Sequence, residues 1–335
     1  MHPYKLAFTI ALSLFSILNY GQHTDQINSN RPGETMSAYA VGKKVIQIES
    51  GVFGITENHS LLNYDANGFG VDLTARYGIW KENLEIIADF QYQNETFSSR
   101  TSDFKKSDFK QTIFGAKYLI YDPFKNYKRK IDIKSWKKNR RFDLHQLIPA
   151  VSVFAGANLS FSDNQYYFSK KGAISPKFIL MTQNHLGDGS WVFVTNFIAD
   201  YLFTEYPSLG YGVTLTKAFT PNWSGFVENQ GYKSDFYSDC IVRGGAAYLI
   251  NKNMQIDASI SSSVKTTPYL FYGGIGISWR NDKYHKNVII KTDIKDPNAF
   301  DPKAKGDKKE TEKEKKKKDK KAAEAIRKEL KKKQG

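Results

Sequence analysis

The sequence predicts an all-β fold, an antiparallel transmembrane β-barrel of about 12 strands. Three observations predict it: short segments in which apolar and polar residues alternate, an N-terminal export signal, and an exported chain with a single cysteine. Alternation turns one side of each strand toward lipid and the other toward a polar interior. A soluble β-sandwich alternates with the same period, so the remaining features have to separate the two folds.

The N-terminus predicts export. Lys5 precedes an apolar run over residues 6–18, and small residues near Gly21 end this run. The pattern is that of a signal peptide over residues 1–21, followed by an N-terminal periplasmic segment over residues 22–42. The run is too short to cross a bilayer, and no later segment offers the roughly 20 apolar residues of a membrane helix. Cys240 has no second cysteine to pair with, so strand pairing and packing must stabilise the fold.

The barrel is predicted to occupy residues 43–280. Most of its strands reach the roughly 9 to 11 residues that a tilted strand needs to cross a bilayer, and their even number puts both chain ends on the periplasmic side. In the eleventh strand Ile256 and Ile260 lie on one side, and Asp257 lies on the other. The expected strands cover residues 43–55, 66–78, 82–97, 105–119, 147–161, 174–184, 190–204, 208–218, 222–234, 237–249, 253–264 and 269–280.

The turns between these strands are alternately tight and long. Gly, Asn and Pro favour tight periplasmic turns at residues 79–83, 186–189, 220–221 and 250–252. Extracellular loops are expected at residues 59–65, 98–104, 163–171, 204–207, 233–236 and 265–268. These loops are moderate in length, and none looks like a large plug.

Aromatic residues support a membrane location. The chain contains 20 Tyr, 23 Phe and 5 Trp, and many of them fall near strand ends, as Trp80, Trp223 and Trp279 do. Rings at the two interfaces of a bilayer form girdles of this kind. In a sandwich the same rings would belong to the core.

Positive charge is concentrated in two segments rather than spread over the barrel. The net charge is +15, of which residues 121–146 supply +6 and residues 301–335 supply +8. Both segments are predicted to be periplasmic, the first as a basic insert and the second within a linker and Lys-rich tail over residues 281–335. This location argues against a nucleic-acid partner.

The two basic segments have two interpretations. They are either solvated, or they attach the barrel to acidic lipid, peptidoglycan or an acidic periplasmic protein. The residues expected to make such a tether are Arg129, Lys130, Lys137, Lys138, Arg140, Arg141, Lys315, Lys316, Lys317 and Lys318.

Charged and amide residues on the inward side of the strands define a candidate lumen. They are Glu49, Asp72, Arg76, Glu85, Asp89, Lys117, Asn196, Glu228, Arg243 and Asp257. An arginine inside a barrel is costly without a carboxylate, so we expect Arg76, Arg243 and Arg280 to form ion pairs. Their expected partners are Glu49, Glu85, Glu228 and Asp257. Such a network either fixes the strands or lines a narrow path for solutes.

Several short blocks resemble a known family. The segment NSNRPGETMSAYAVGKKVIQIESG is followed by ARYGIWKENLEI, IFGAKYLI, FVENQG and MQIDASI. These blocks resemble the outer-membrane "transporter" family associated by name with the meta-cleavage pathway of phenol degradation, over about residues 28–280. The resemblance implies uptake of small, often aromatic or hydrophobic compounds. The basic insert and the Lys-rich tail depart from the family pattern.

The sequence does not favour an enzyme, a metal site or a cofactor. The histidines are scattered, and His185 is the one near a strand, at a predicted periplasmic end. No G-x-S-x-G elbow occurs, and Cys240 stands alone. We therefore expect an outer-membrane barrel, surrounded by lipid, that passes small solutes through a narrow charged lumen. The alternative is a non-conducting scaffold barrel of an envelope complex.

Overall fold

The computed structural model describes residues 27, 29–100, 102–125, 127, 134–135, 143–160, 164–166, 174–187, 189–235 and 238–285. This part of the chain forms twelve β-strands and one short 3-10 helix, η1 (Leu144–Leu147). The strands are β1 (Ile46–His59), β2 (Tyr64–Gly78), β3 (Leu84–Ser99), β4 (Asp103–Tyr121), β5 (Ala150–Leu159), β6 (Ile174–Leu186), β7 (Trp191–Asp200), β8 (Ser208–Ala218), β9 (Trp223–Lys233), β10 (Ser238–Asn251), β11 (Met254–Ser263) and β12 (Tyr269–Asn281).

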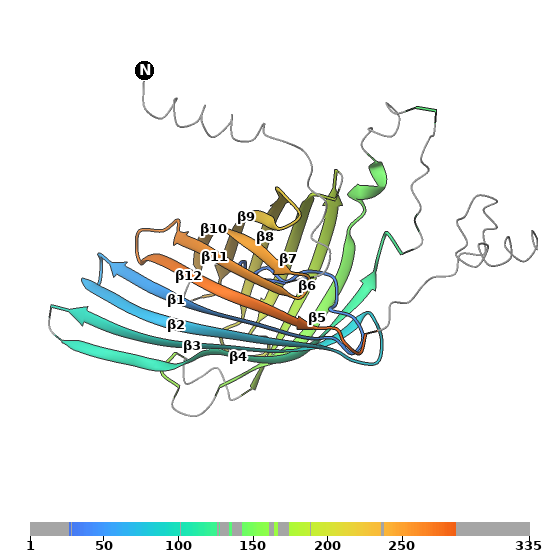
Figure 1. The fold of residues 1–335 in the computed structure, drawn as a ribbon. Coiled ribbons are helices and arrows are strands. Elements are labelled where there is room, and N and C mark those ends of the chain that lie inside the picture. Colours follow the sequence, from blue (N-terminus) through green and yellow to red (C-terminus); the bar gives the residue numbers. More distant parts are fainter. Residues whose placement is uncertain are drawn as a thin grey trace, which may run out of the picture. The chain divides into compact units, whose positions relative to one another are not determined.

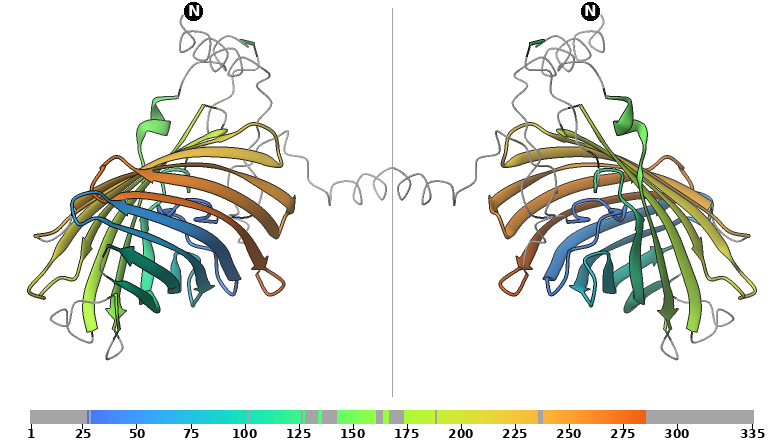
Figure 2. Two further views of the ribbon diagram at one scale, coloured as in Figure 1. Left: turned by 90° about the vertical axis from the view of Figure 1, so that its left-hand side faces the viewer. Right: turned by 90° about the vertical axis from the view of Figure 1, so that its right-hand side faces the viewer.

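The twelve strands close into one barrel, as the sequence predicts (Figure 1). Each strand pairs antiparallel with its neighbours in the sequence, and β1 closes the ring by pairing with β12 from Ile46 and Asn281 to Asn58 and Tyr269. Views from two sides show the strands tilted around a common interior (Figure 2). The predicted bounds differ from the observed ones by a few residues; β1 begins at Ile46 rather than at residue 43.

Polarity is inverted relative to a soluble protein. In β11 the side chains of Ile256 and Ile260 are 43% and 62% exposed, whereas Asp257 and Ser261 face inward and are 6% and 5% exposed. The other strands repeat the arrangement, so the outer wall is apolar and the charges lie inside. This is the wall that a lipid bilayer requires. No helix in the described ranges is long and apolar enough to cross a membrane.

Aromatic side chains ring both ends of the wall, as predicted. At the end with tight turns the exposed rings include Tyr77, Trp80 and Trp223. At the other end they include Phe203 and Tyr269. The two bands match the girdles of membrane barrels.

The first four strands are long, and β4 is the longest strand of the wall. They contain 14, 15, 16 and 19 residues, whereas β5, β7 and β11 contain 10 each. They extend farther toward the end with long loops than β10 and β11 do (Figure 1). Since about 11 residues span a bilayer, β3 and β4 continue beyond the apolar wall.

The segment before β1 lies inside the barrel. Residues 29–41, which we call the plug, fold across the lumen, and within them Ala38 and Val41 are 0% and 2% exposed. From the sequence, we expected residues 22–42 in the periplasm and no loop that forms a large plug. That expectation is corrected for residues 29–41: hydrogen bonds from the plug to side chains of β1, β3, β6 and β9 hold it within the barrel.

An apolar cluster holds the middle of the plug. Ala38 is buried against inward-facing side chains of β3 to β6, and Met36 and Tyr39 pack on the same cluster. The members on the wall are Ile87, Ile113, Leu119, Ala150, Phe154, Ile179 and Met181. Apolar residues at inward positions therefore mark where the plug rests.

Glycines in β2 and β12 make room for an inward-facing ring. Phe53 of β1 pairs across the strands with Gly70 and Gly274. A Cβ atom on Gly274 would lie 2.8 Å from the Phe53 Cβ and 3.0 Å from the Val52 carbonyl oxygen. These contacts are too short to form without moving the backbone.

Replacing Gly274 by alanine is expected to destabilise the barrel by about 1–3 kcal/mol, because the added methyl group overpacks the wall. The free energy of unfolding in lipid vesicles, measured by urea titration, tests this. Gly273→Ala is the matched control, since a Cβ on that neighbouring glycine meets nothing within 4 Å. Equal stability of the two variants would contradict the packing argument.

Candidate functional site

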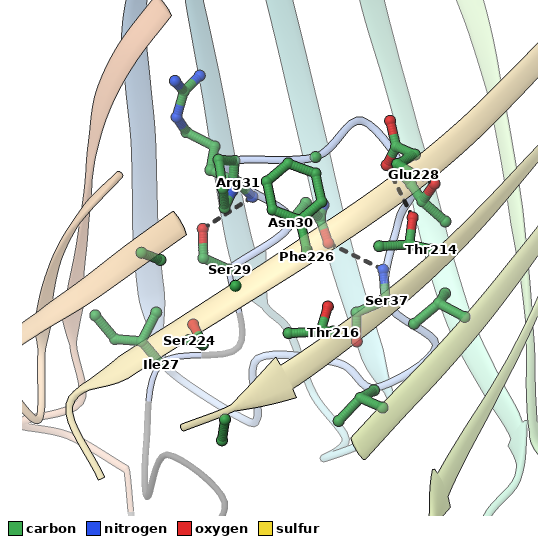
Figure 3. A pocket seen from close by; sticks show the side chains of 18 of the residues that line it. Ile27, Ser29, Asn30, Arg31, Ser37, Thr214, Thr216, Ser224, Phe226 and Glu228 are labelled. Atoms are coloured by element: carbon green, nitrogen blue, oxygen red, sulfur yellow. Dashed lines mark hydrogen bonds between the residues drawn. The ribbon is translucent and has the colours of Figure 1, made fainter. Parts of the chain in front are cut away.

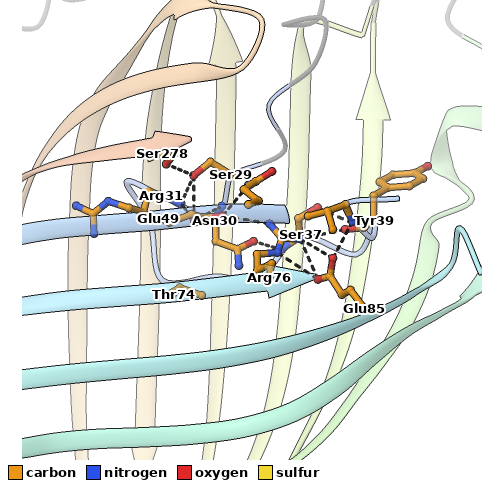
Figure 4. Close-up of polar contacts among 12 residues, drawn as sticks. Ser29, Asn30, Arg31, Ser37, Tyr39, Glu49, Thr74, Arg76, Glu85 and Ser278 are labelled. Carbon is orange, nitrogen blue, oxygen red and sulfur yellow. Dashed lines mark hydrogen bonds and ion pairs between the residues drawn. The ribbon is translucent and has the colours of Figure 1, made fainter. Parts of the chain in front are cut away.

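The candidate site is the interface between the plug and the lumen wall (Figure 4). Glu49 of β1 binds the beginning of the plug: it accepts hydrogen bonds from the Ser29 hydroxyl at 3.0 Å and from the backbone N–H groups of Asn30 and Arg31 at 3.1 and 3.3 Å. Ser29 also shares a hydrogen bond of 2.7 Å with Ser278 of β12. A carboxylate buried inside the barrel thus satisfies backbone donors of the plug.

Arg31 bridges two strands, β2 and β11, that are not neighbours in the sheet. Its guanidinium forms ion pairs with Asp72 of β2 and with Asp257 of β11, the latter at 3.2 Å. Gly51 and Gly276, which pair with each other across β1 and β12, lie under the guanidinium and leave the space that a Cβ atom would fill. The plug therefore carries the cation for two carboxylates of the wall.

A second group of charges lies beside the C-terminal end of the plug and is fully buried. Arg76 pairs with Glu85 at 3.0 Å and with Glu49 at 3.2 Å, and Lys117 pairs with Glu85 at 2.7 Å. The predicted ion pairs of Arg76 are confirmed.

These charges also bind the backbone of the plug. Lys117 Nζ donates to the carbonyl oxygens of Ser37 and Tyr39, both at 2.9 Å, and the Val41 N–H donates to Glu85 at 2.7 Å. Arg280 donates to the Val41 carbonyl oxygen at 3.0 Å. Arg280 therefore also binds the plug, and the ion pair expected for it stays a prediction.

Glu228 of β9 holds the middle of the plug from the opposite wall. It accepts hydrogen bonds from the Glu34 and Thr35 backbone N–H groups and from the Thr35 hydroxyl, the last at 2.8 Å. Thr214 of β8 donates to the same carboxylate at 2.9 Å, and Arg243 of β10 forms an ion pair with it. The pair predicted for Arg243 is confirmed.

Nine of the ten predicted lumen residues thus contact the plug. Asn196 faces the backbone of Met36, where its amide oxygen accepts from the N–H at 2.6 Å and its nitrogen donates to the carbonyl at 3.0 Å. Asp89 is the exception and accepts hydrogen bonds from Thr74 and Gln111 of the wall. Sequence reasoning found the wall residues but missed Arg31, although this arginine stands in the Ser- and Asn-rich block just before the first strand.

The predicted tether residues lie outside the described part of the chain. They are Arg129, Lys130, Lys137, Lys138, Arg140, Arg141, Lys315, Lys316, Lys317 and Lys318. Both described ends of the basic insert meet at the barrel end. The rings of Tyr127 and His145 stack with centroids 3.7 Å apart, and the Tyr127 hydroxyl donates to Asp143 at 2.5 Å.

A hydrogen-bond relay runs from His185 of β6 into the plug. Gln183 accepts from the Ala38 N–H at 3.0 Å and from the Ser37 hydroxyl at 2.8 Å, so its oxygen faces the plug. Its amide nitrogen then faces His185 Nε2 at 3.1 Å, which must be the acceptor. The Tyr39 ring packs beside His185 with centroids 5.6 Å apart.

Tyr39 links the plug to the start of the basic insert. Its hydroxyl donates to Asp122 at 3.3 Å. Burial, together with the nearby Asp122 carboxylate, raises the pKa of the Tyr39 hydroxyl above its ordinary value. Tyr39 therefore stays neutral and keeps its donor role across the physiological range.

A cavity of about 130 Å³ lies between the plug and the wall formed by β6 to β11 (Figure 3). The plug contributes residues 29–33 to it, and the wall contributes Thr214, Thr216, Ser224 and Phe226. The described residues offer no cluster of His, Cys, Asp or Glu that could hold a metal ion.

Comparison with known proteins identifies relatives of this structure. The model of the family described as "Putative MetA-pathway of phenol degradation" matches residues 29–281, a range that includes the plug. The resemblance drawn from the sequence blocks is confirmed. No curated protein matches the chain.

Several solved structures are similar. An outer membrane channel from Pseudomonas putida F1 has 10% identity, with 75% of this chain and 99% of that chain covered and a TM-score of 0.48. The translocator domain of the autotransporter NalP from Neisseria meningitidis has 10% identity, 72% and 89% coverage and a TM-score of 0.42. The CymD monoaromatic hydrocarbon channel has 9% identity, 71% and 88% coverage and a TM-score of 0.38.

Acidification is expected to loosen the plug at Ala38. A protonated imidazole has no acceptor nitrogen, so a protonated His185 Nε2 would be a donor facing the amide donor of Gln183. Turning the amide to satisfy His185 removes the acceptor of the Ala38 N–H, which costs about 1–3 kcal/mol. This stabilisation is present at high pH and lost as pH falls, so hydrogen exchange at Ala38, corrected for its intrinsic rate, should accelerate.

The controls are two single variants. His185→Gln should abolish the pH dependence, whereas His285→Gln, outside the relay, should preserve it. Tyr39, whose hydroxyl donates to Asp122, is a titratable group that packs beside His185. Unchanged pH dependence in His185→Gln would refute the relay.

Proposed function

This chain belongs to the family named for the MetA pathway of phenol degradation, and from that premise we propose that it is an outer-membrane barrel that passes small solutes through its lumen when the plug moves. The observation that carries the proposal is the plug itself, which lies across the lumen and contacts the wall through ion pairs and hydrogen bonds. A barrel that served only as a wall would need no segment folded into its lumen. The family description favours aromatic or hydrophobic compounds as solutes.

The contacts of the plug support a segment that can leave its place. Ion pairs and hydrogen bonds hold it at Glu49, Asp72, Glu85 and Glu228, and each of these carboxylates can be hydrated once the plug is displaced. The apolar anchor at Ala38 is small. The same charged residues therefore bind the plug when it is in place and line the channel when it is displaced.

Arg31 is the residue whose loss should open the path most directly. Arg31→Ala leaves Asp72 and Asp257 without their shared cation, and breaking a buried ion pair destabilises its surroundings by about 3–5 kcal/mol. In planar bilayers the wild-type protein should show stepwise conductance, and Arg31→Ala should be open at least about tenfold more of the time.

Lys81→Ala is the matched control, because it removes a cation from an exposed turn and should leave the conductance unchanged. Electrical silence of folded wild-type protein and of Arg31→Ala alike would refute passage through the lumen.

A second candidate function is a scaffold in an envelope complex, favoured by the charge distribution. Residues 121–146 and 301–335 supply +6 and +8 of the net +15, and most of them lie outside the described residues. Such segments suit peptidoglycan carboxylates or an acidic periplasmic protein. Deleting residues 301–335 should remove crosslinked partners or cell-wall material from a pulldown of the full chain. An unchanged set of crosslinked material would exclude the scaffold.

A further inference from the structure

We propose that the cavity beside the plug is a binding site for a small, uncharged molecule that carries hydroxyl groups. The proposal rests on the proposed function and names the solute class for which the lumen is built. Figure 3 shows the site, with the plug segment from Ser29 to Ser37 on one side and inward-facing side chains of β8 and β9 on the other.

Charge is the first reason for this class. Among the residues that line the cavity, Arg31 and Glu228 are the ones with a formal charge. Each is already paired, Arg31 with Asp72 and Asp257, and Glu228 with Arg243. An anionic solute would lose its hydration without gaining a cation, because Arg31 is already shared by two carboxylates, whereas a neutral solute avoids this cost.

Hydroxyl groups are the second reason. Thr216 and Ser224 line the cavity from adjacent strands, and within the described part of the chain neither hydroxyl has a hydrogen-bond partner. Both are only partly exposed. A ligand hydroxyl could donate to one and accept from the other, which satisfies groups that otherwise remain unpaired.

The size of the cavity and its apolar surface are the third reason for this solute class. A volume of about 130 Å³ is close to that of cavities that hold one benzene ring. Phe226 pairs across the strands with Thr216, and Val192 and Ala218 continue the apolar surface beside them. The cavity therefore suits a molecule with one apolar face and one or two hydroxyls, no larger than a single ring or a chain of about four carbons.

The position of the cavity ties an occupant to the plug. Residues 29–33 form one side of it, and the same residues bind Glu49 and, through Arg31, Asp72 and Asp257. A neutral solute in the cavity thus contacts the plug while Arg31 stays paired with Asp72 and Asp257.

The test compares two solutes of equal length that cross bilayers poorly by themselves. Proteoliposomes of the full-length protein are diluted into erythritol or into sodium threonate, and swelling rates are recorded. Erythritol is expected to enter at least about tenfold faster than threonate. The double variant Thr216→Val with Ser224→Ala keeps the shape but removes both hydroxyls, and should lower the ratio of the two rates about tenfold.

Thr56→Val is the matched control, since Thr56 faces outward on β1, and it should keep the wild-type ratio. Folding of each variant is checked by the heat-dependent shift of its electrophoretic mobility. Equal entry of erythritol and threonate would overturn the solute class while leaving the channel intact. An unchanged ratio in the double variant would mean that the cavity holds only water. Absence of both swelling and conductance in wild-type protein would refute the proposed function itself.

Discussion

The structure depends on the neutralisation of charges inside a barrel that faces lipid. Asp72 and Asp257 project inward from strands on either side of the β1–β12 pair, and both form ion pairs with a single guanidinium on the plug. A buried carboxylate without a partner is costly, so the wall and the plug stabilise each other. The same reciprocity recurs at Glu85 and Lys117, whose ion pair also satisfies backbone groups of the plug. The charged side chains of the lumen are thus stabilised by groups of the plug, and the plug by them.

The plug meets different chemistry along its length. Buried ion pairs of β1 to β4 hold its two ends, and an apolar cluster on β3 to β6 receives Ala38 in the middle. The wall from β6 to β11 offers mainly hydroxyl, amide and small apolar groups, and there a cavity remains. Charged side chains thus bind the plug at several points of the wall, and the mainly uncharged surface around the cavity leaves space beside it. His185 contacts both Gln183, which binds the plug, and Phe124, at the barrel end where the basic insert begins.

Sequence reasoning located the wall well because each strand is governed by a local rule. A strand buried between lipid and a polar interior must alternate, so Ile256 and Asp257 reveal their sides without any knowledge of the rest. The ion pairs of Arg76 and Arg243 were predictable for the same reason, since an inward arginine needs an inward carboxylate. Ile87, Phe154 and Met181 are inward yet apolar, and this break in the pattern was the available sign that something packs inside.

The chain by itself determined the strand count, the side that each wall residue faces and the inward set of charges, because these follow from a period of two and the cost of burying charge. Tertiary structure alone decided what those charges bind. Arg31 lies 226 residues from Asp257 and 41 from Asp72, and closure of β1 on β12 brings the three together. No local pattern encodes that meeting, since the plug has no strand periodicity and its place is set by the space and charge of the closed lumen.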